Sequence, residues 1–370
     1  MATPRRVALT LEQCWHEVPG GTATSALASI EALRAHTDLD LIGVAARHRL
    51  PPADGFRPAI PVGELSLPRL VLYEAWHRLR RPRVERATGP VDVIHVTGMA
   101  MPPRSAPLVV TVHDLAFVDE PAHFTARGVR FFHRAIDLAV ADADVVVCPS
   151  QATIDDCVRY GFTPDRLRLV PWGISTPVAS EDAVAAARAR YDLKAPYVFW
   201  TGTVEPRKNL GALLDAFARI ERDDVELVLG GPAGWHGELD ALEQRLGGRV
   251  RRIGFVPVAD LPAVYAGAEV FCFPSLREGF GLPVLEAMAQ GVPVVTSSGT
   301  ATAEVVGDAG AGVLVEPRDP VAIAGALDAI LGDPVAARTM GAAAATRAQK
   351  YVAARAAADL VRAYDDAVGA

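Results

Sequence analysis

The chain has 370 residues and a formal net charge of −7, with 50% hydrophobic and 22% charged residues. This length and composition predict two or three globular domains that fold without disulfides or structural metals. The acidic balance argues against a nucleic-acid-binding protein. The start does not resemble a signal peptide, and no stretch reaches the 18 apolar residues of a membrane span.

The four cysteines (14, 148, 157 and 272) form no CxxC motif, and Cys148 and Cys272 lie in apolar runs. We therefore expect buried free thiols, not disulfides or a zinc site, in a protein of the reducing cytoplasm. We expect no bound metal.

The first half of the chain alternates short runs of Val, Leu and Ile with helical patterns. We expect strands at 7–11, 41–45, 93–97, 108–113 and 145–148, and helices near 22–36, 127–141 and 151–160. Gly20 and Gly21 lie just before the first of these helices and predict a flexible loop that could approach a phosphate or a sugar. His113 closes a predicted strand and precedes Asp114. A histidine at a strand end can be structural or functional, and the pattern leaves both open.

Segment 69–86 (RLVLYEAWHRLRRPRVER) differs in charge from the rest of the chain. It carries six Arg and two Glu, a net charge of +4 against −11 for the remainder. Beside the arginines, an apolar face could be formed by Leu70, Leu72, Tyr73, Trp76 and Leu79. Two interpretations stay open: docking to an anionic membrane or a lipid-phosphate acceptor, or a helix packed on its own domain with a solvated rim of arginines.

The second half repeats the alternation. Strands are expected at 197–201, 225–230, 250–256, 270–275 and 292–297, and helices at 209–221, 237–246, 260–266, 283–290 and 320–331. A long Ala-rich helix is expected at about 335–368. Nearly continuous apolar strands joined by helices predict parallel sheets covered on both faces, with a domain boundary between Gly173 and Ser180.

Two positive charges follow the first strand of this second half. Arg207 and Lys208 come just before the helix at 209–221, with Asn209 as its expected cap. Cations and free amides at a helix N-terminus suit a diphosphate, because Arg can bind two oxygens at once while Lys acts as a point charge. The alternative is a solvated charge pair that balances Glu205.

The segment REGFGLPVLEAMAQGVPVV (277–295) carries the most information. It places Glu278 and Glu286 eight residues apart around a Gly-Phe-Gly-Leu-Pro bend. We expect Gly279 and Gly281 to adopt backbone angles that other residues avoid, and Pro283 to begin a helix with Glu286 in its first turn. The amides of 279–282 would then be free to bind hydroxyl or anionic oxygens. The alternative is a surface turn followed by a helix with a solvated Glu.

Taken together, these motifs resemble those of the retaining glycosyltransferases of family 4. The resemblance rests on EGFGLPVLE (278–286), EPRKN (205–209), HDL (113–115), VPWGI (170–174) and the glycine pair at 20–21. It implies an α/β fold in which two Rossmann-like domains face each other across a cleft, the GT-B architecture. Residues 1–175 would form the acceptor domain, residues 176–351 the donor domain, and a C-terminal helix at about 352–370 would pack back on the first.

The resemblance also implies an activity: transfer of a hexose-type sugar from a nucleotide-diphosphate sugar to an acceptor hydroxyl, with retained anomeric configuration. The acceptor could be a lipid-linked or cell-envelope glycan. Neither a cofactor nor a metal is implied. The protein is expected in the cytoplasm. Peripheral contact to the inner face of the membrane through 69–86 stays open beside the alternative of a helix packed on its own domain.

Each motif then has an implied role. Arg207 and Lys208 would bind the donor phosphates, and Glu286 the ribose hydroxyls. Glu278 and the amides of the bend would surround the donor sugar, and His113 would lie near the reacting carbon. The implied donor-binding residues are Gly20, Gly21, Gly279, Phe280, Gly281, Leu282 and Glu286.

Four other functions are alternatives to sugar transfer. An NAD-dependent oxidoreductase would need GxGxxG after the first strand, where EQCWHEVPGGTA lacks that spacing. A metal-dependent transferase would use Asp142 and Asp144, but that pair precedes a strand, and two parallel sheets do not suit that fold. A non-catalytic sugar-nucleotide-binding module or an epimerase of the same fold would use similar contacts, so these two stay open.

Overall fold

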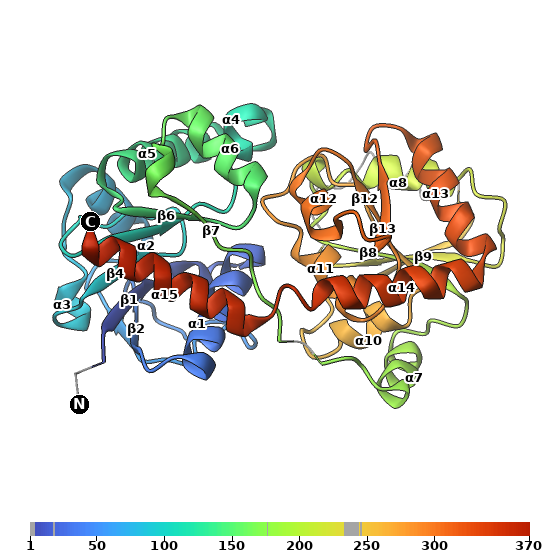
Figure 1. Cartoon of the computed structure of the whole chain (residues 1–370), viewed down its shortest axis with the longest axis horizontal. Helices are drawn as coiled ribbons and strands as arrows, with labels where there is room; N and C mark the ends of the chain where they lie inside the picture. The colour runs from blue at the N-terminus through green and yellow to red at the C-terminus, as the bar shows by residue number, and fades with distance from the viewer. Residues whose placement is uncertain (1–3, 18, 176, 233–243, 245) are drawn as a thin grey trace. The chain divides into compact units, whose positions relative to one another are not determined.

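The chain folds into two compact units (Figure 1). The computed structural model describes residues 4–17, 19–175, 177–232, 244 and 246–370. Met1–Ile174 and Tyr351–Ala370 form the first unit, and Ser175–Lys350 form the second. Both borders lie within one residue of the division expected from the sequence.

A seven-stranded parallel sheet forms the centre of the first unit, in the order β3-β2-β1-β4-β5-β6-β7. The strands are β1 (Arg6–Thr10), β2 (Asp40–Ala45), β3 (Val62–Glu64), β4 (Val93–Val96), β5 (Leu108–Thr111), β6 (Val145–Cys148) and β7 (Leu167–Leu169). The five strands expected here are confirmed. The strands β3 and β7 were not expected, because three residues are too few to show an apolar run.

Helices cover both faces of this sheet. They are α1 (Gly20–His36), α2 (Arg69–Glu74), α3 (Glu85–Thr88), α4 (Ala116–Asp119), α5 (Ala126–Asp142), α6 (Gln151–Tyr160) and α15 (Ala353–Gly369). On one face, α1 and α15 pack side by side over the sheet (Figure 1). The backbone secures α15 where it begins, since Ile174 N donates to the carbonyl of Tyr351 at 2.9 Å.

The second unit contains a six-stranded parallel sheet in the order β10-β9-β8-β11-β12-β13. Its strands are β8 (Tyr197–Thr201), β9 (Glu226–Gly230), β10 (Val250–Gly254), β11 (Val270–Phe273), β12 (Val294–Ser297) and β13 (Gly312–Val315). Its described helices are α7 (Glu181–Arg190), α8 (Leu210–Phe217), α10 (Leu261–Ala266), α11 (Leu282–Ala289), α12 (Ala301–Val306), α13 (Pro320–Gly332) and α14 (Pro334–Ala348). The strand β13 and the helices α7 and α12 were not expected. The helix expected at 237–246 lies almost entirely outside the described residues.

The long C-terminal helix expected at 335–368 is two helices. The helix α14 ends at Ala348 in the second unit, and α15 begins at Ala353 in the first. Within the described chain no single helix is long and apolar enough to cross a membrane. The helices α13 and α14 are long and apolar enough only when taken together, and the pair is bent by 104°.

The single apolar face expected in 69–86 is wrong. Leu72 and Trp76 are buried in the core, whereas Leu70 and Leu79 are 54% and 71% exposed. Leu70 lies about 200° around α2 from Leu72, so the two cannot share a face, and the π-helical turn at Ala75–Leu79 then rotates Leu79 away from Leu72 and Trp76. The Trp76 indole N–H donates to the carbonyl of Pro82 at 2.9 Å and so fixes this turn to the following residues.

The prediction of buried free thiols is confirmed for all four cysteines. Cys148 and Cys157 are neighbours, with their Sγ atoms 3.8 Å apart. Burial raises the pKa of the Cys272 thiol well above its ordinary value. The cysteines thus contribute to the core as small apolar groups.

The strand orders show where a ligand would bind. In each sheet the order reverses beside the first strand, between β1 and β4 in one unit and between β8 and β11 in the other. The loops after two such strands diverge to opposite faces and leave a crevice outside the carboxyl ends of the strands. In the second unit these two loops carry Arg207, Lys208 and Glu278.

Candidate functional site

Backbone and side-chain hydrogen bonds hold the loop after β8 against the loop after β11. Leu276 N donates to the carbonyl of Arg207 at 2.8 Å. The Asn209 side-chain amide donates to the carbonyls of Pro274 at 2.9 Å and Pro317 at 2.6 Å, which joins the loops after β8, β11 and β13. Asn209 occupies the N-cap position of α8, but its side chain makes no capping hydrogen bond, so the capping role expected for it is wrong.

Four charged side chains meet where these loops touch, and we call them the charged cluster: Glu205, Arg207, Lys208 and Glu278. One carboxylate joins both cations, with Glu278 Oε2 3.0 Å from Arg207 Nη1 and Glu278 Oε1 2.6 Å from Lys208 Nζ. The other guanidinium nitrogen, Nη2, donates to Glu205 Oε1 at 2.8 Å. Ser275, which the sequence did not single out, has its hydroxyl 2.6 Å from Glu278 Oε1.

Within the charged cluster, Glu278 is held in its ionised form. Burial opposes ionisation of Glu278, but the charges of Arg207 and Lys208 outweigh it and lower the pKa of this carboxyl to about 2. Burial lowers the pKa of Lys208, against the effect of Glu278. Two cations and two carboxylates give the cluster a formal charge of zero. Arg207 does pair with Glu205, but its side chain is only 19% exposed, so the interpretation as a solvated surface pair is wrong.

The bend before α11 depends on Gly281. Its φ of +106° is left-handed, and a Cβ there would lie 2.6 Å from Thr302 Cγ2, so no other residue fits. The matching expectation for Gly279 is wrong, because Gly279 is not among the glycines with positive φ. The helix α11 begins at Leu282, one residue earlier than expected, which places Glu286 just beyond the first turn.

The carboxyl of Glu286 is bound by a tyrosine. Tyr265 Oη donates to Glu286 Oε2 at 2.9 Å. Burial raises the pKa of the Glu286 carboxyl to about 7, and the hydrogen bond from Tyr265 offsets part of that rise. The sequence predicted that Tyr265 lies in a helix but gave it no role in binding, because no motif connects Tyr265 with Glu286.

In the first unit, His113 has a defined tautomer. Its Nε2 lies 2.9 Å from the carbonyl oxygen of Thr97, which can only accept, so Nε2 carries the proton and Nδ1 is left as an acceptor. Gln13 Nε2 donates to the hydroxyl of the same Thr97 at 2.8 Å and holds that residue in place. Burial lowers the pKa of His113, so the ring is neutral at neutral pH. Its centroid lies 5.4 Å from that of Trp172.

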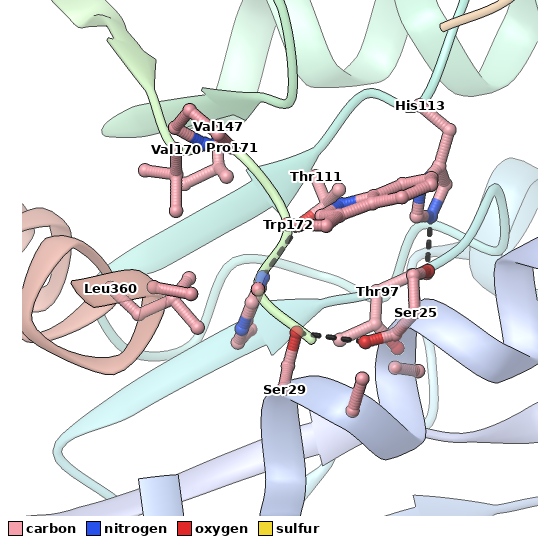
Figure 2. A pocket seen from close by; sticks show the side chains of 15 residues that line it. Ser25, Ser29, Thr97, Thr111, His113, Val147, Val170, Pro171, Trp172 and Leu360 are labelled. Atoms are coloured by element: carbon pink, nitrogen blue, oxygen red, sulfur yellow. Dashed lines mark hydrogen bonds between the residues drawn. The ribbon is translucent and has the colours of Figure 1, made fainter. Parts of the chain in front are cut away.

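A small polar cavity of about 20 Å³ lies beside this histidine, with room for a water molecule (Figure 2). Its polar lining consists of Ser25, Ser29, His95, Thr97, Thr111 and His113. His95 is buried, with Nδ1 2.8 Å from the hydroxyl of Tyr364 on α15 and Nε2 2.8 Å from that of Thr111. The cavity is therefore lined by α1, α15 and the carboxyl ends of the strands.

The structure does not bring all the expected site residues together. Arg207, Lys208 and Glu278 bond directly, and Glu286 lies on the helix that follows the bend in the same unit. Gly20 and Gly21 form the first turn of α1, so the loop expected there is wrong. A Cβ on either would meet no atom within 4 Å, which leaves their surface open.

Two family models match the chain, one in each half. The model described as Glycosyltransferase Family 4 matches residues 19–177, and the model described as Glycosyl transferases group 1 matches residues 195–333. The D-inositol 3-phosphate glycosyltransferase of Xylanimonas cellulosilytica is 32% identical over an alignment of 311 residues that covers 78% of this chain and 75% of that protein. This chain belongs to the group 1 glycosyltransferases.

Further relatives of this glycosyltransferase agree with that assignment. The O-antigen chain mannosyltransferase B of Escherichia coli is 34% identical over 249 residues, 62% of this chain and 63% of the relative. The Anabaena protein HepE, solved in complex with UDP and glucose, matches with a TM-score of 0.75 and 20% identity over 97% of this chain and 99% of that one. That match shows the fold: two Rossmann-like domains of the GT-B type.

The acidic pair weighed for a metal-dependent transferase has structural roles in this glycosyltransferase. Asp142 pairs with Arg80, and Asp144 pairs with Arg104 at 2.7 Å while it accepts from Leu108 N at 2.8 Å. Within the described residues, no group of three His, Cys, Asp or Glu side chains is arranged to hold a metal ion. The NAD-dependent oxidoreductase is likewise set aside by the family assignment.

Proposed function

We propose that this glycosyltransferase transfers a hexose-type sugar from a nucleotide-diphosphate sugar to an acceptor hydroxyl, with retained anomeric configuration and without a metal. The observation that supports this most directly is the charged cluster between the ends of β8 and β11. Two nearly buried cations there lie at the point of the sheet where ligands of such folds bind. The UDP and glucose bound by HepE and the mannosyltransferase activity in the name of the E. coli relative agree with this class of donor.

The chemistry of the reaction explains why cations belong in this position. As the bond to the anomeric carbon breaks, negative charge develops on the departing diphosphate and positive charge on the sugar ring. Arg207 and Lys208 would stabilise the diphosphate, with Arg207 offering two donors to separate oxygens. No metal is then required, since fixed side-chain charges supply the stabilisation that a divalent cation would give.

The remaining residues would fix the rest of the donor. Glu286 would accept hydrogen bonds from the two ribose hydroxyls, and the amides of the bend at Gly279, Phe280, Gly281 and Leu282 would approach the sugar. Glu278 would have two tasks: it orients both cations, and it accepts from a sugar hydroxyl. We also propose that the neutral ring of His113 lies beside the donor sugar, and that the backbone of Gly20 and Gly21 contacts the donor.

A panel of nucleotides and sugar nucleotides would test the proposal. Thermal shifts with UDP, GDP, ADP and TDP and their sugars would identify the donor, because a ligand at 100 times its dissociation constant stabilises by about 2.7 kcal/mol. The reaction is then followed by mass spectrometry. Loss of the donor that requires an acceptor supports transfer, isomerisation of the donor alone indicates an epimerase, and binding without turnover indicates a non-catalytic module.

Metal independence gives a first prediction. Transfer is expected to continue at an unchanged rate in an excess of EDTA, because Arg207 and Lys208 supply the charge that a metal would. The assay compares initial rates before and after chelation, with and without added Mg²⁺. Complete loss of activity that Mg²⁺ restores would overturn this prediction.

Peripheral contact with a membrane through 69–86 gives a second prediction. Although the single apolar face does not exist, Leu70, Val71 and Leu79 are each more than half exposed, and Arg78, Arg81 and Arg83 are exposed beside them in the chain. Replacing these three arginines by glutamate is expected to abolish sedimentation with anionic vesicles, since each basic residue near such a surface contributes about 1 kcal/mol.

The control for this prediction reverses three exposed arginines elsewhere in the first unit: Arg34, Arg49 and Arg355. Both variants change the net charge equally, so a general electrostatic effect would weaken both. Unchanged sedimentation of the 69–86 variant would remove this segment from the membrane contact.

A further inference from the structure

A hydrogen bond joins Tyr265 and Glu286 in the second unit. Glu286 lies on α11, and its carboxyl accepts from Tyr265 Oη on α10 through Oε2. The elements packed against α11 are α10, α12, α14, β11 and β12. They carry three other charged residues, Glu304 on α12 and Arg338 and Arg347 on α14.

None of these three groups compensates Glu286. Arg347 donates to the backbone carbonyls of Glu304 and Val305, and Arg338 is exposed. The pKa of Glu286 responds to its burial and to the hydroxyl of Tyr265. Glu286 is half-buried, and among the described residues its carboxylate has the hydroxyl of Tyr265 as its hydrogen-bond donor in place of part of its hydration.

Tyr265 is itself held rigidly. Its side chain is buried, and its ring packs edge-on against Phe199 at 5.3 Å and Phe271 at 5.2 Å between centroids. Those two rings come from β8 and β11, the strands that flank the crevice of this sheet. The hydroxyl of Tyr265 is thus placed by the same strands that carry the charged cluster at their ends.

We propose that Tyr265 is a positioning residue for donor binding: it fixes Oε2 of Glu286 and so orients the carboxylate toward the vicinal ribose hydroxyls. This inference rests on the proposed function, in which Glu286 binds the ribose. The hydroxyl has a second effect, because it stabilises the ionised carboxylate in a place where burial favours the neutral acid. Tyr265 therefore extends the pH range in which Glu286 can accept two hydrogen bonds.

The direction of the pH effect follows from which form binds. Only the ionised carboxylate accepts from both ribose hydroxyls, so affinity for the nucleotide is full above the pKa of Glu286, at about 7, and falls as the pH drops through it. Removing the hydroxyl of Tyr265 raises that pKa further. The acid limb of the binding profile then moves to higher pH.

The experiment uses the full chain and two readouts. The carboxyl of Glu286 is titrated by ¹³C NMR without ligand, and the dissociation constants of UDP and GDP are measured by calorimetry from pH 5.5 to 9. In the Tyr265→Phe variant we expect both midpoints to rise by about one pH unit, which weakens binding about tenfold below the midpoint. If the variant does not fold, 3-fluorotyrosine at position 265 replaces it. Its more acidic hydroxyl donates more strongly and should move both midpoints down.

Two further variants separate the possible outcomes. Tyr191 Oη donates to Asp260 Oδ2 at 2.8 Å in the same unit, so Tyr191→Phe is a matched control that should leave both profiles unchanged. Glu286→Gln should bind weakly at every pH. If Glu286→Gln binds the nucleotides as the wild type does, the proposed role of Glu286 fails. If Glu286→Gln is weak but the Tyr265→Phe midpoints equal those of the wild type, only the positioning role of Tyr265 is overturned.

Discussion

Replacing Lys208 by alanine is expected to lower the turnover number for sugar transfer by about two to three orders of magnitude while the protein stays folded. The ammonium group lies in a nearly buried position, 4.9 Å from the ring of Phe273, where its charge is poorly screened. Charge on the leaving diphosphate grows only as the reaction proceeds, so the loss should appear mainly in kcat and less in the donor KM. Arg207 remains to compensate Glu278, which preserves the fold.

The measurement is steady-state kinetics with the donor that the nucleotide panel identifies. Lys194 offers a matched control, because it is a lysine of the same unit whose side chain is 83% exposed and pairs with Asp192. Lys194→Ala should keep wild-type rates. A Lys208→Ala enzyme with a wild-type kcat would refute the placement of the leaving group at the charged cluster.

The Glu278→Gln variant is expected to lose about 3 kcal/mol of unfolding free energy, because its amide leaves two nearly buried cations without their shared carboxylate. The folded-state pKa of Glu278 lies below its ordinary value of 4.5, so the carboxylate stabilises the fold fully above 4.5. That contribution is lost as the pH falls toward 2. The difference between wild type and variant should therefore be constant from pH 6 to 8 and shrink in acid.

Urea denaturation measures this loss, and inorganic diphosphate provides a second test. The variant cluster has a formal charge of +1 where the wild type has zero, so diphosphate should stabilise the variant more than the wild type. Glu226→Gln is the control: Glu226 makes a two-point pair with the more exposed Arg251 at 3.1 and 3.2 Å, and its loss should cost less than about 1 kcal/mol. Equal stabilisation of wild type and Glu278→Gln by diphosphate would contradict an anion site here.

The sequence predicted the sheets well because buried parallel strands consist of consecutive apolar residues. YVFWT at 197–201 and VVVC at 145–148 are strands with those bounds. The edge strands Val62–Glu64 and Gly312–Val315 carry less of that signal, because they are only partly buried. The face expected in 69–86 failed for two other reasons: Leu70 lies on the opposite side of α2 from Leu72, and the helical period changes at Ala75.

The candidate site was predictable only where a local rule applied. The left-handed Gly281 and the charges at 207 and 208 could be found from their own neighbours. The contacts of Lys208 with Glu278, 70 residues away, and of Tyr265 with Glu286 depend on β8 lying next to β11, which the order of residues does not state. Ser275 lies only three residues before Glu278, and it was missed because no motif marks a hydroxyl at that spacing in a loop.

The return of α15 to the first unit has a consequence for biosynthesis. Ala357, Leu360 and Tyr364 complete the apolar core on one face of the first sheet, yet they are translated after the whole second unit. A nascent chain that has emerged as far as 174 still exposes the part of that face that α15 covers. The amino-terminal half can thus reach its final state only after α15 has left the ribosome, later than the whole second unit.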